Sequence, residues 1–273
     1  MRHIDADTIT QAVIARYAAV GDARLREVMT SLVQHLHAFA RDVRLTEAEW
    51  AEGLRFLADS GRDAARGRPE VALLSDSLGL TALVTAANQR RPRGCTEATL
   101  TVPWSANGVP YHAGEGPGER CYVRGHVRAL DGAPIAGAEV QAGLPVNEGP
   151  QGVLLTDAEG RFLFETAVAA PQPIARDGRV GRLLHALGGP PWRPAHLRFT
   201  ISAAGYERLV TQLFREGDPY LDADAVFGVR SSLVTDWVRH EGGRTPDGHT
   251  SALPFTTLDF TFVLNNATTG DKT

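Results

Sequence analysis

Apolar residues in the first hundred positions recur at three- and four-residue spacings, the pattern of helices with one buried face. Thr46 and Glu49 have the spacing of a capping box, which predicts a helix start there. A further helix is predicted over residues 76–89, and the proline in 90–94 marks its end. The third helix is expected to point Trp50, Leu54 and Leu57 inward. The apolar faces of the other helices consist of Ile9, Val13, Ile14 and Tyr17; Leu25, Val28, Met29, Leu32, Leu36 and Phe39; and Leu80, Leu83, Val84 and Ala87.

Beyond about residue 120 the hydrophobic pattern alternates with a period of two, which indicates short strands. Long connections rich in Gly and Pro separate these strands and favour a β-sandwich over alternating β and α elements. The predicted fold is α+β and mainly β, with a helical region over 1–100 and an antiparallel β-sandwich over 101–273. The predicted strands cover 122–127, 138–141, 160–164, 197–201 and 258–264.

Composition narrows the functional classes without selecting one. The chain has 273 residues, 43% of them hydrophobic and 22% charged, which is the composition of a folded globular protein. A net charge of −4 argues against a nucleic-acid partner, and two cysteines are too few for a disulfide scaffold. No apolar run approaches the roughly 18 residues of a membrane span, so a cytoplasmic protein is expected. Tyrosine is scarce, at five residues.

Common catalytic motifs are missing from the sequence. It contains neither a glycine loop for phosphate ahead of a helix nor a G-x-S-x-G nucleophile turn. The basic cluster at 90–94 is interpreted as a solvated helix end. Tyr111 and His112 lie in a loop rich in Gly and Pro and are candidates to reach into a cleft.

Nine short segments, in order along the chain, resemble the intradiol ring-cleavage dioxygenases, in particular the catechol and hydroxyquinol 1,2-dioxygenase branch. The resemblance covers roughly residues 5–265. It implies a helical dimerisation region, a homodimer, an active site between the helices and the sandwich, and room for a lipid in a helical tunnel. The segments are 73–80, 96–99, 134–138, 156–160, 177–181, 192–199, 204–206, 209–212 and 222–229.

The family holds a ferric ion with two tyrosinates and two histidines, and this chain departs from that set. Its first histidine position matches His196, but the second is Arg198, and the tyrosine positions fall on Glu148 and Gln172. No tyrosine occurs between residues 122 and 206. Because a guanidinium stays protonated, it cannot ligate a cation. The sequence therefore predicts that the family's iron site is lost.

Other pocket positions match the family. Arg193 matches an arginine that stabilises the substrate-derived intermediate, and Gln212 matches a glutamine beside the metal ligands. Trp104 takes an aromatic position of the family's substrate loop. The candidate catalytic residues are His196, Arg193, Arg198, Glu148, Gln172 and Gln212, and the candidate substrate-binding residues are Trp104, Tyr111, His112 and Leu78.

The preferred hypothesis is an enzyme without a cofactor that cyclises, isomerises or hydrolyses an aromatic or polyketide-like, enolisable substrate. In it His196 acts as acid or base, an arginine stabilises an oxyanion, and Glu148 and Arg198 form a buried ion pair. One alternative is an aromatic ring-cleaving dioxygenase with an unusual iron site built on His196 and Glu148, helped by His112. The other is a pseudoenzyme that binds a ligand or a partner subunit.

Overall fold

The computed structural model describes residues 4–66, 70–99, 119–144 and 152–267. Contacts between residues divide the chain into two compact units, Met1–Arg62 and Asp63–Thr273. The first unit is helical, whereas the second contains the sheets and three short helices.

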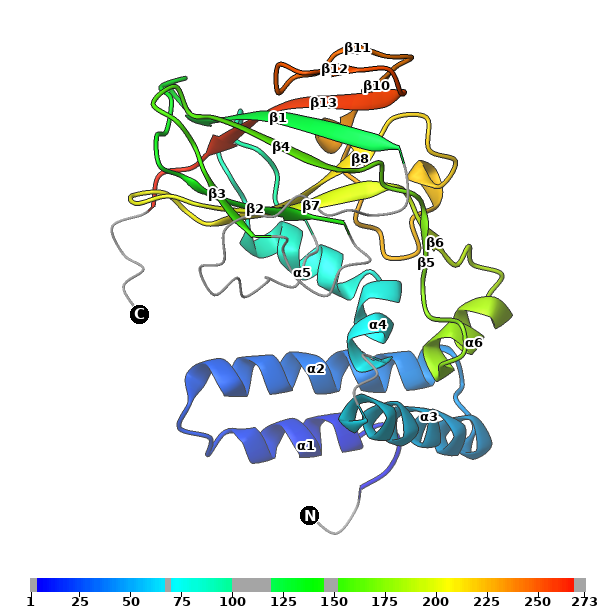
Figure 1. Cartoon of the computed structure of the whole chain (residues 1–273). Helices are drawn as coiled ribbons and strands as arrows, with labels where there is room; N and C mark the ends of the chain where they lie inside the picture. The colour runs from blue at the N-terminus through cyan, green and yellow to red at the C-terminus, as the bar shows by residue number, and fades with distance from the viewer. Residues whose placement is uncertain (1–3, 67–69, 100–118, 145–151, 268–273) are drawn as a thin grey trace. The chain divides into compact units, whose positions relative to one another are not determined.

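Three helices begin the chain: α1 (Ile9–Tyr17), α2 (Ala23–Asp42) and α3 (Glu47–Ala65). The side chain of Asp22 caps α2 by accepting a hydrogen bond from the backbone N–H of Leu25 at 3.0 Å. The predicted capping box is confirmed, since Glu49 accepts from the Thr46 backbone N–H at 2.9 Å and Thr46 Oγ1 accepts from that of Glu49 at 3.3 Å. Figure 1 shows α1 and α2 side by side.

The apolar faces predicted for α2 and α3 are exposed in the single chain. Leu36 is 54% exposed, Trp50 55% and Leu57 55%, and Val33 is the one buried residue of α2. The helical spacing is therefore correct, whereas Trp50 and Leu57, which were expected to point inward, are exposed among the described residues of the single chain. Each helix forms an apolar stripe that the described residues of one chain leave uncovered.

The helix predicted over 76–89 corresponds mainly to α5 (Leu80–Asn88), and its first two residues belong to the end of a separate helix, α4 (Glu70–Ser77). Gly79 separates them with a φ of +69°, a left-handed conformation that ends one helix and turns the chain before the next. No single helix of the described chain has the length and apolar character needed to span a membrane. The pair α4 and α5, bent by 73°, passes that test together on length and composition alone.

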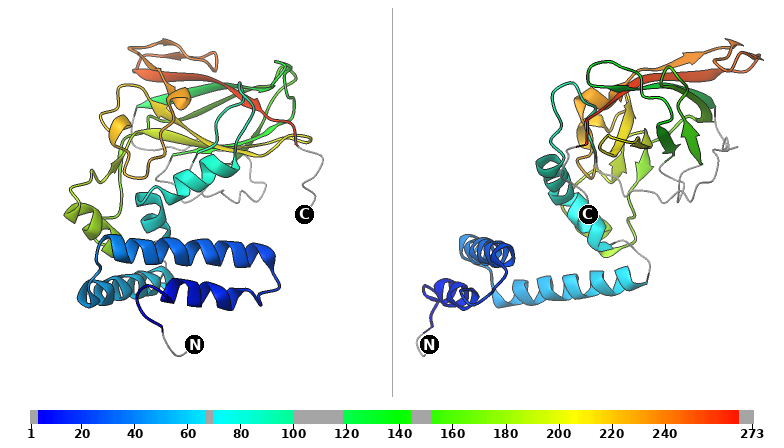
Figure 2. Two further views of the ribbon diagram at one scale, coloured as in Figure 1. Left: turned by 180° about the vertical axis from the view of Figure 1, so that it is seen from behind. Right: turned by 90° about the vertical axis from the view of Figure 1, so that its left-hand side faces the viewer.

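The second unit contains two stacked sheets, which Figure 1 and Figure 2 show as two layers. The five-stranded sheet has the order β3 (Val153–Leu155), β2 (Glu139–Gly143), β7 (His196–Ser202), β8 (Leu209–Arg215) and β9 (Val234–Thr235). The four-stranded sheet has the order β10 (Trp237–His240), β13 (Phe255–Leu264), β1 (Arg120–Ala129) and β4 (Arg161–Ala167). Two-stranded ribbons join β5 (Gln172–Pro173) to β6 (Trp192–Arg193) and β11 (Gly243–Arg244) to β12 (Thr250–Ser251).

The core fills the space between the two sheets. Phe199 of β7 packs against Phe262 of β13 with ring centroids 4.9 Å apart, and Leu197 and Ile201 are also fully buried there. The α+β fold class is confirmed. The sandwich is not purely antiparallel, because β1 and β13 run parallel to each other, as do β8 and β9.

Candidate functional site

Strand β7 places two of the candidate residues on its outer face. Because successive side chains of a strand point to opposite faces, the burial of Leu197 and Phe199 in the core directs His196 and Arg198 away from it. Gln212 lies directly opposite Arg198 on the neighbouring strand β8. The outer face of the five-stranded sheet therefore carries a histidine, an arginine and a glutamine together.

Arg193 of the ribbon strand β6 is held by two side chains. Its Nε donates to Oδ1 of Asp224 at 3.1 Å, and its Nη2 donates to Oε1 of Gln212 at 3.0 Å and to Oδ2 of Asp224 at 3.4 Å. The Arg193 side chain is 12% exposed and that of Asp224 3%. Solvent screens such a pair little, so the carboxylate fixes both the charge and the orientation of the guanidinium.

The loop that contains Asp224 is itself fitted around this ion pair. The backbone N–H groups of Gly228 and Val226 donate to the Asp224 carboxylate at 2.8 and 3.3 Å. A Cβ atom at Gly228 would lie 2.9 Å from Nη2 of Arg193 and 3.1 Å from Oδ2 of Asp224. Only glycine leaves this space free, so residues 224–228 form a cradle that positions Arg193.

His196 is completely buried beside Arg193. Its Nδ1 donates to the carbonyl oxygen of Pro194 at 2.8 Å, which leaves Nε2 as the acceptor of a long contact from Nη1 of Arg193 at 3.4 Å. Burial and the neighbouring guanidinium of Arg193 hold the pKa of His196 well below its ordinary value. The imidazole is therefore neutral at neutral pH.

Arg198 adds a second positive charge to the same face. Burial, followed by the charge of Arg193, lowers the pKa of Arg198 to about 10, so the side chain still carries its proton at neutral pH. Two guanidinium groups and a neutral imidazole thus line this part of the outer face. This arrangement favours anions over cations.

The structure brings some of the predicted site residues together and not others. Arg193, His196 and Gln212 are in direct contact, and Arg198 lies next to them on the same face. Gln172 pairs with Arg193 across the β5–β6 ribbon, but its amide donates to the carbonyl of Ala170 at 3.1 Å. Leu78 is 66% exposed after the end of α4. Trp104, Tyr111, His112 and Glu148 lie outside the described residues, as does the expected ion pair between Glu148 and Arg198.

Asp224 and Gly228 are site residues that the sequence did not identify. Both fall inside a segment that resembles the family, but Asp224 lies 31 positions from Arg193. A single acidic residue in a loop gives no sign of its partner. Only the return of this loop to the β6 strand shows that the carboxylate belongs to the site.

The described residues do not fit the ferric ion that the family resemblance implies. Within the described ranges no group of three or more His, Cys, Asp and Glu side chains could hold a metal ion. The acceptor nitrogen of His196 faces Nη1 of Arg193, and Arg198 places another cation nearby. The described residues on the outer face of the five-stranded sheet therefore do not supply a set of ligands for a ferric ion.

Two family models match the chain: the catechol dioxygenase N terminus over residues 22–96, and the dioxygenase model over residues 141–266. The chain therefore belongs to the intradiol ring-cleavage dioxygenase family, as the motifs predicted. It is 48% identical to the 6-chlorohydroxyquinol 1,2-dioxygenase of Cupriavidus pinatubonensis, over 97% of this chain and 99% of the relative. It is 38% identical to the hydroxyquinol 1,2-dioxygenase of Nocardioides simplex, over 94% of each chain.

A solved structure confirms the architecture. The hydroxyquinol 1,2-dioxygenase of Pseudomonas putida DLL-E4 superposes with a TM-score of 0.88 at 34% identity, over 96% of this chain and 99% of that one. The helical region and the sandwich therefore both belong to the family fold.

These comparisons overturn the predicted function. A metal-free enzyme for cyclisation, isomerisation or hydrolysis is wrong, because a relative 48% identical along nearly the whole chain is a ring-cleaving 1,2-dioxygenase. The same finding contradicts the expectation that ring cleavage has been lost.

Proposed function

We propose that the protein is an aromatic ring-cleaving dioxygenase of the intradiol type that acts on a hydroxyquinol-type diol. The observation that carries the proposal is the 48% identity, over 97% of the chain, to a 6-chlorohydroxyquinol 1,2-dioxygenase. The resemblance implies iron for this reaction. Since His196 is the one imidazole among the described site residues, further ligands would come from outside the described ranges, where Glu148 and His112 lie.

The described residues support binding of the diol as an anion. Arg193 presents a fixed guanidinium, because Asp224 and Gln212 hold it from two sides. Arg198 adds its charge from the adjacent strand position. Positive groups close to a phenol favour its deprotonated form, and preoriented donors stabilise negative charge that develops on oxygen. These two arginines would therefore bind the ionised diol and the oxyanions that follow from it.

Oxygen uptake tests the proposal directly. The purified protein, with its iron content measured, is mixed with benzene-1,2,4-triol, and dissolved oxygen is followed with an electrode. We expect one molecule of oxygen to be consumed for each diol and a ring-opened dicarboxylate to be detected by mass spectrometry. Resorcinol, whose hydroxyl groups are not adjacent, serves as the control substrate. Iron-loaded protein that consumes no oxygen with the triol would refute the proposal.

Ligand binding without ring cleavage is the second candidate function, and the charge of Arg198 beside Arg193 is the observation that favours it. Under this hypothesis the triol binds, as measured by calorimetry, but oxygen is not consumed at any iron content. Turnover of the triol excludes this hypothesis.

The exposed apolar face of α2 supports a homodimer formed through the N-terminal helices. This face has no cover among the described residues of one chain, and a contiguous exposed apolar face is typical of an interface. We expect light scattering to give twice the 29.3 kDa of one chain. The double substitution Leu32→Glu and Leu36→Glu should give monomers, and an unchanged mass would contradict this assignment. The exposed apolar face of α2 consists of Leu25, Val28, Leu32, Leu36 and Phe39.

A lipid bound between the helices is a further expectation, and native mass spectrometry tests it.

A further inference from the structure

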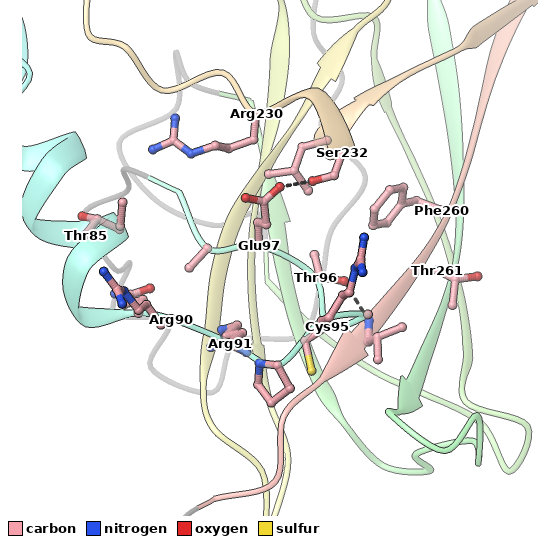
Figure 3. A pocket seen from close by; sticks show the side chains of 18 residues that line it. Thr85, Arg90, Arg91, Cys95, Thr96, Glu97, Arg230, Ser232, Phe260 and Thr261 are labelled. Carbon is pink, nitrogen blue, oxygen red and sulfur yellow. Dashed lines mark hydrogen bonds between the residues drawn. The ribbon is translucent and has the colours of Figure 1, made fainter.

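A cavity of about 720 Å³ lies apart from the cluster around Arg193. Its walls are the end of α5, the segment 89–98, the turn at Ser232 and Leu233, and strand β13. Figure 3 shows Arg90 and Arg91 just after α5, with Arg230 on a loop across the view. Cavities of this size accommodate small organic molecules.

The charge of this cavity is strongly positive. Arg90, Arg91, Arg93 and Arg230 line it, and Glu97 is the one acidic residue among its lining residues. Ser232 donates a hydrogen bond to the Glu97 carboxylate. For the residues that the structure describes, no carboxylate lies within 4.0 Å of any of these four guanidinium groups. Four cations and one anion therefore face one cavity in a protein whose net charge is −4.

Two of these arginines are held by neutral acceptors only. Nη2 of Arg91 donates to the carbonyl of Arg208 at 2.7 Å, while its Nε and Nη1 are buried with no hydrogen-bond partner. Burial lowers the pKa of Arg91. Nη1 of Arg230 donates to the carbonyls of Val229 at 2.9 Å and Phe227 at 3.2 Å. The charge of Glu207 partly offsets that of Arg91, but two buried donors of Arg91 stay unsatisfied, so a bound anion would stabilise the cavity.

The floor of the cavity is formed in advance by the two sheets. Thr96 donates its backbone N–H to the carbonyl of Val263 at 3.0 Å, and its Oγ1 accepts from the Val263 N–H at 2.8 Å. The N–H of Thr99 donates to the carbonyl of Val210 at 3.0 Å. The segment that carries the basic cluster is thereby fixed to β13 on one side and to β8 on the other. A ligand would meet a wall that is already ordered, which reduces the entropy lost on binding.

We propose that this cavity binds a small organic dianion. Its guanidinium groups come from two walls, the segment 90–93 and the loop at Arg230, so they suit two separate oxyanion groups. Phe260 and Leu233 supply apolar surface for the carbon skeleton between those groups. The basic cluster, interpreted from the sequence as a solvated helix end, is thus part of a binding site.

Carboxylate and phosphate groups share the chemistry that these arginines recognise. Intradiol cleavage of a diol yields a dicarboxylate, which has the required charge and size. The identification of the ligand as such a product rests on the proposed function, whereas the anion site itself does not.

Isothermal titration calorimetry at low salt tests the site with two probes, cis,cis-muconate as dicarboxylate and fructose 1,6-bisphosphate as bisphosphate. The test variant is the triple substitution Arg90→Gln, Arg93→Gln and Arg230→Gln, which leaves the more buried Arg91 in place. The control variant removes the same charge from exposed helical positions in the first unit, by Arg16→Gln, Arg24→Gln and Arg55→Gln.

We expect one probe molecule to bind per chain, with affinity at least tenfold weaker in the test variant and changed less than twofold in the control variant. The probe that binds more tightly identifies the ligand as carboxylate or phosphate. The inference is overturned if neither probe binds, or if both variants lose affinity equally. It is also overturned if Arg193→Gln abolishes binding while the test variant does not. The calorimetry measures binding without turnover, so its result can be interpreted even if the protein does not cleave a ring.

Discussion

Replacing Asp224 with asparagine tests whether this carboxylate positions Arg193. The substitution keeps the shape of the side chain and one oxygen acceptor, but it removes the charge that faces Nε of Arg193 at 3.1 Å. With the two side chains 12% and 3% exposed, little solvent is available to replace the lost partner. Breaking a buried ion pair by removing one partner costs about 3–5 kcal/mol, and the retained amide oxygen places this variant near the lower figure.

Urea denaturation measures the loss of stability, and a matched control lies two residues away. Asp222 is exposed on the same loop, so Asp222→Asn changes the net charge equally and should alter the free energy of unfolding by less than about 0.5 kcal/mol. A double-mutant cycle with Arg193→Gln should give a coupling energy of about 1–3 kcal/mol between Asp224 and Arg193.

The activity of the Asp224→Asn variant separates positioning from mere stability. If Arg193 binds the ionised diol and acts on the developing oxyanion, loss of its orientation should lower kcat by about a hundredfold and also raise KM. Asp222→Asn should retain the parent kcat. The reasoning is refuted if Asp224→Asn and Asp222→Asn unfold at the same urea concentration, or if the coupling energy is zero.

Three further substitutions probe the packing around the site and the core. Gly228→Ala should lower the free energy of unfolding by about 1–3 kcal/mol, because the added Cβ would meet the guanidinium of Arg193. Gly53→Ala is the control, since nothing lies within 4 Å of that position, and it should not lower stability. Urea denaturation of both variants measures the difference. Glu70→Ala removes the carboxylate that accepts a backbone N–H of the first turn of α6 (Arg179–Ala186) at 2.9 Å, and should cost about 1–3 kcal/mol by the same assay. Burial raises the pKa of Cys121 to about 12, so the folded protein keeps a proton that the unfolded chain loses above pH 9. Stability should therefore fall by about 2 kcal/mol more between pH 8 and pH 10.5 in the parent protein than in Cys121→Ala. Equal pH dependence in both proteins would contradict this assignment.

Alternating hydrophobicity was sufficient to predict the strand that carries the site. Residues 197–201 were predicted, and β7 runs from His196 to Ser202. In the structure, His196 and Arg198 share one face of this strand, because Leu197 and Phe199 are buried on the other. Local pattern therefore predicted the element, and the burial in the structure shows the direction of its side chains.

Contacts between distant segments were not predictable in this way. The apolar spacing over 76–89 continues through Gly79, and only the left-handed backbone there reveals two helices. The spacing in α2 identifies an apolar face but not whether the same chain covers it. Asp224 depends on a loop that returns to β6 from 31 positions away. In each case the missing information is which surfaces of the folded chain are in contact. The spacing of hydrophobic residues along the sequence does not contain that information.

Arg198 shows how sequence motif and whole-chain similarity can disagree about one site. A guanidinium cannot replace an imidazole as a metal ligand, but it brings a positive charge of its own to that face of β7. The side chain of Arg193 donates hydrogen bonds to Asp224 and Gln212, while its charge lowers the pKa of Arg198 on the same face. Under the proposed function, the part of the site that would bind oxyanions lies within the described residues, with Arg198 as a second positive charge beside it. Under the proposed function the arginines would bind the ionised diol, whereas oxygen consumption would also require the iron that the resemblance implies, so the two measurements report on separate parts of the site.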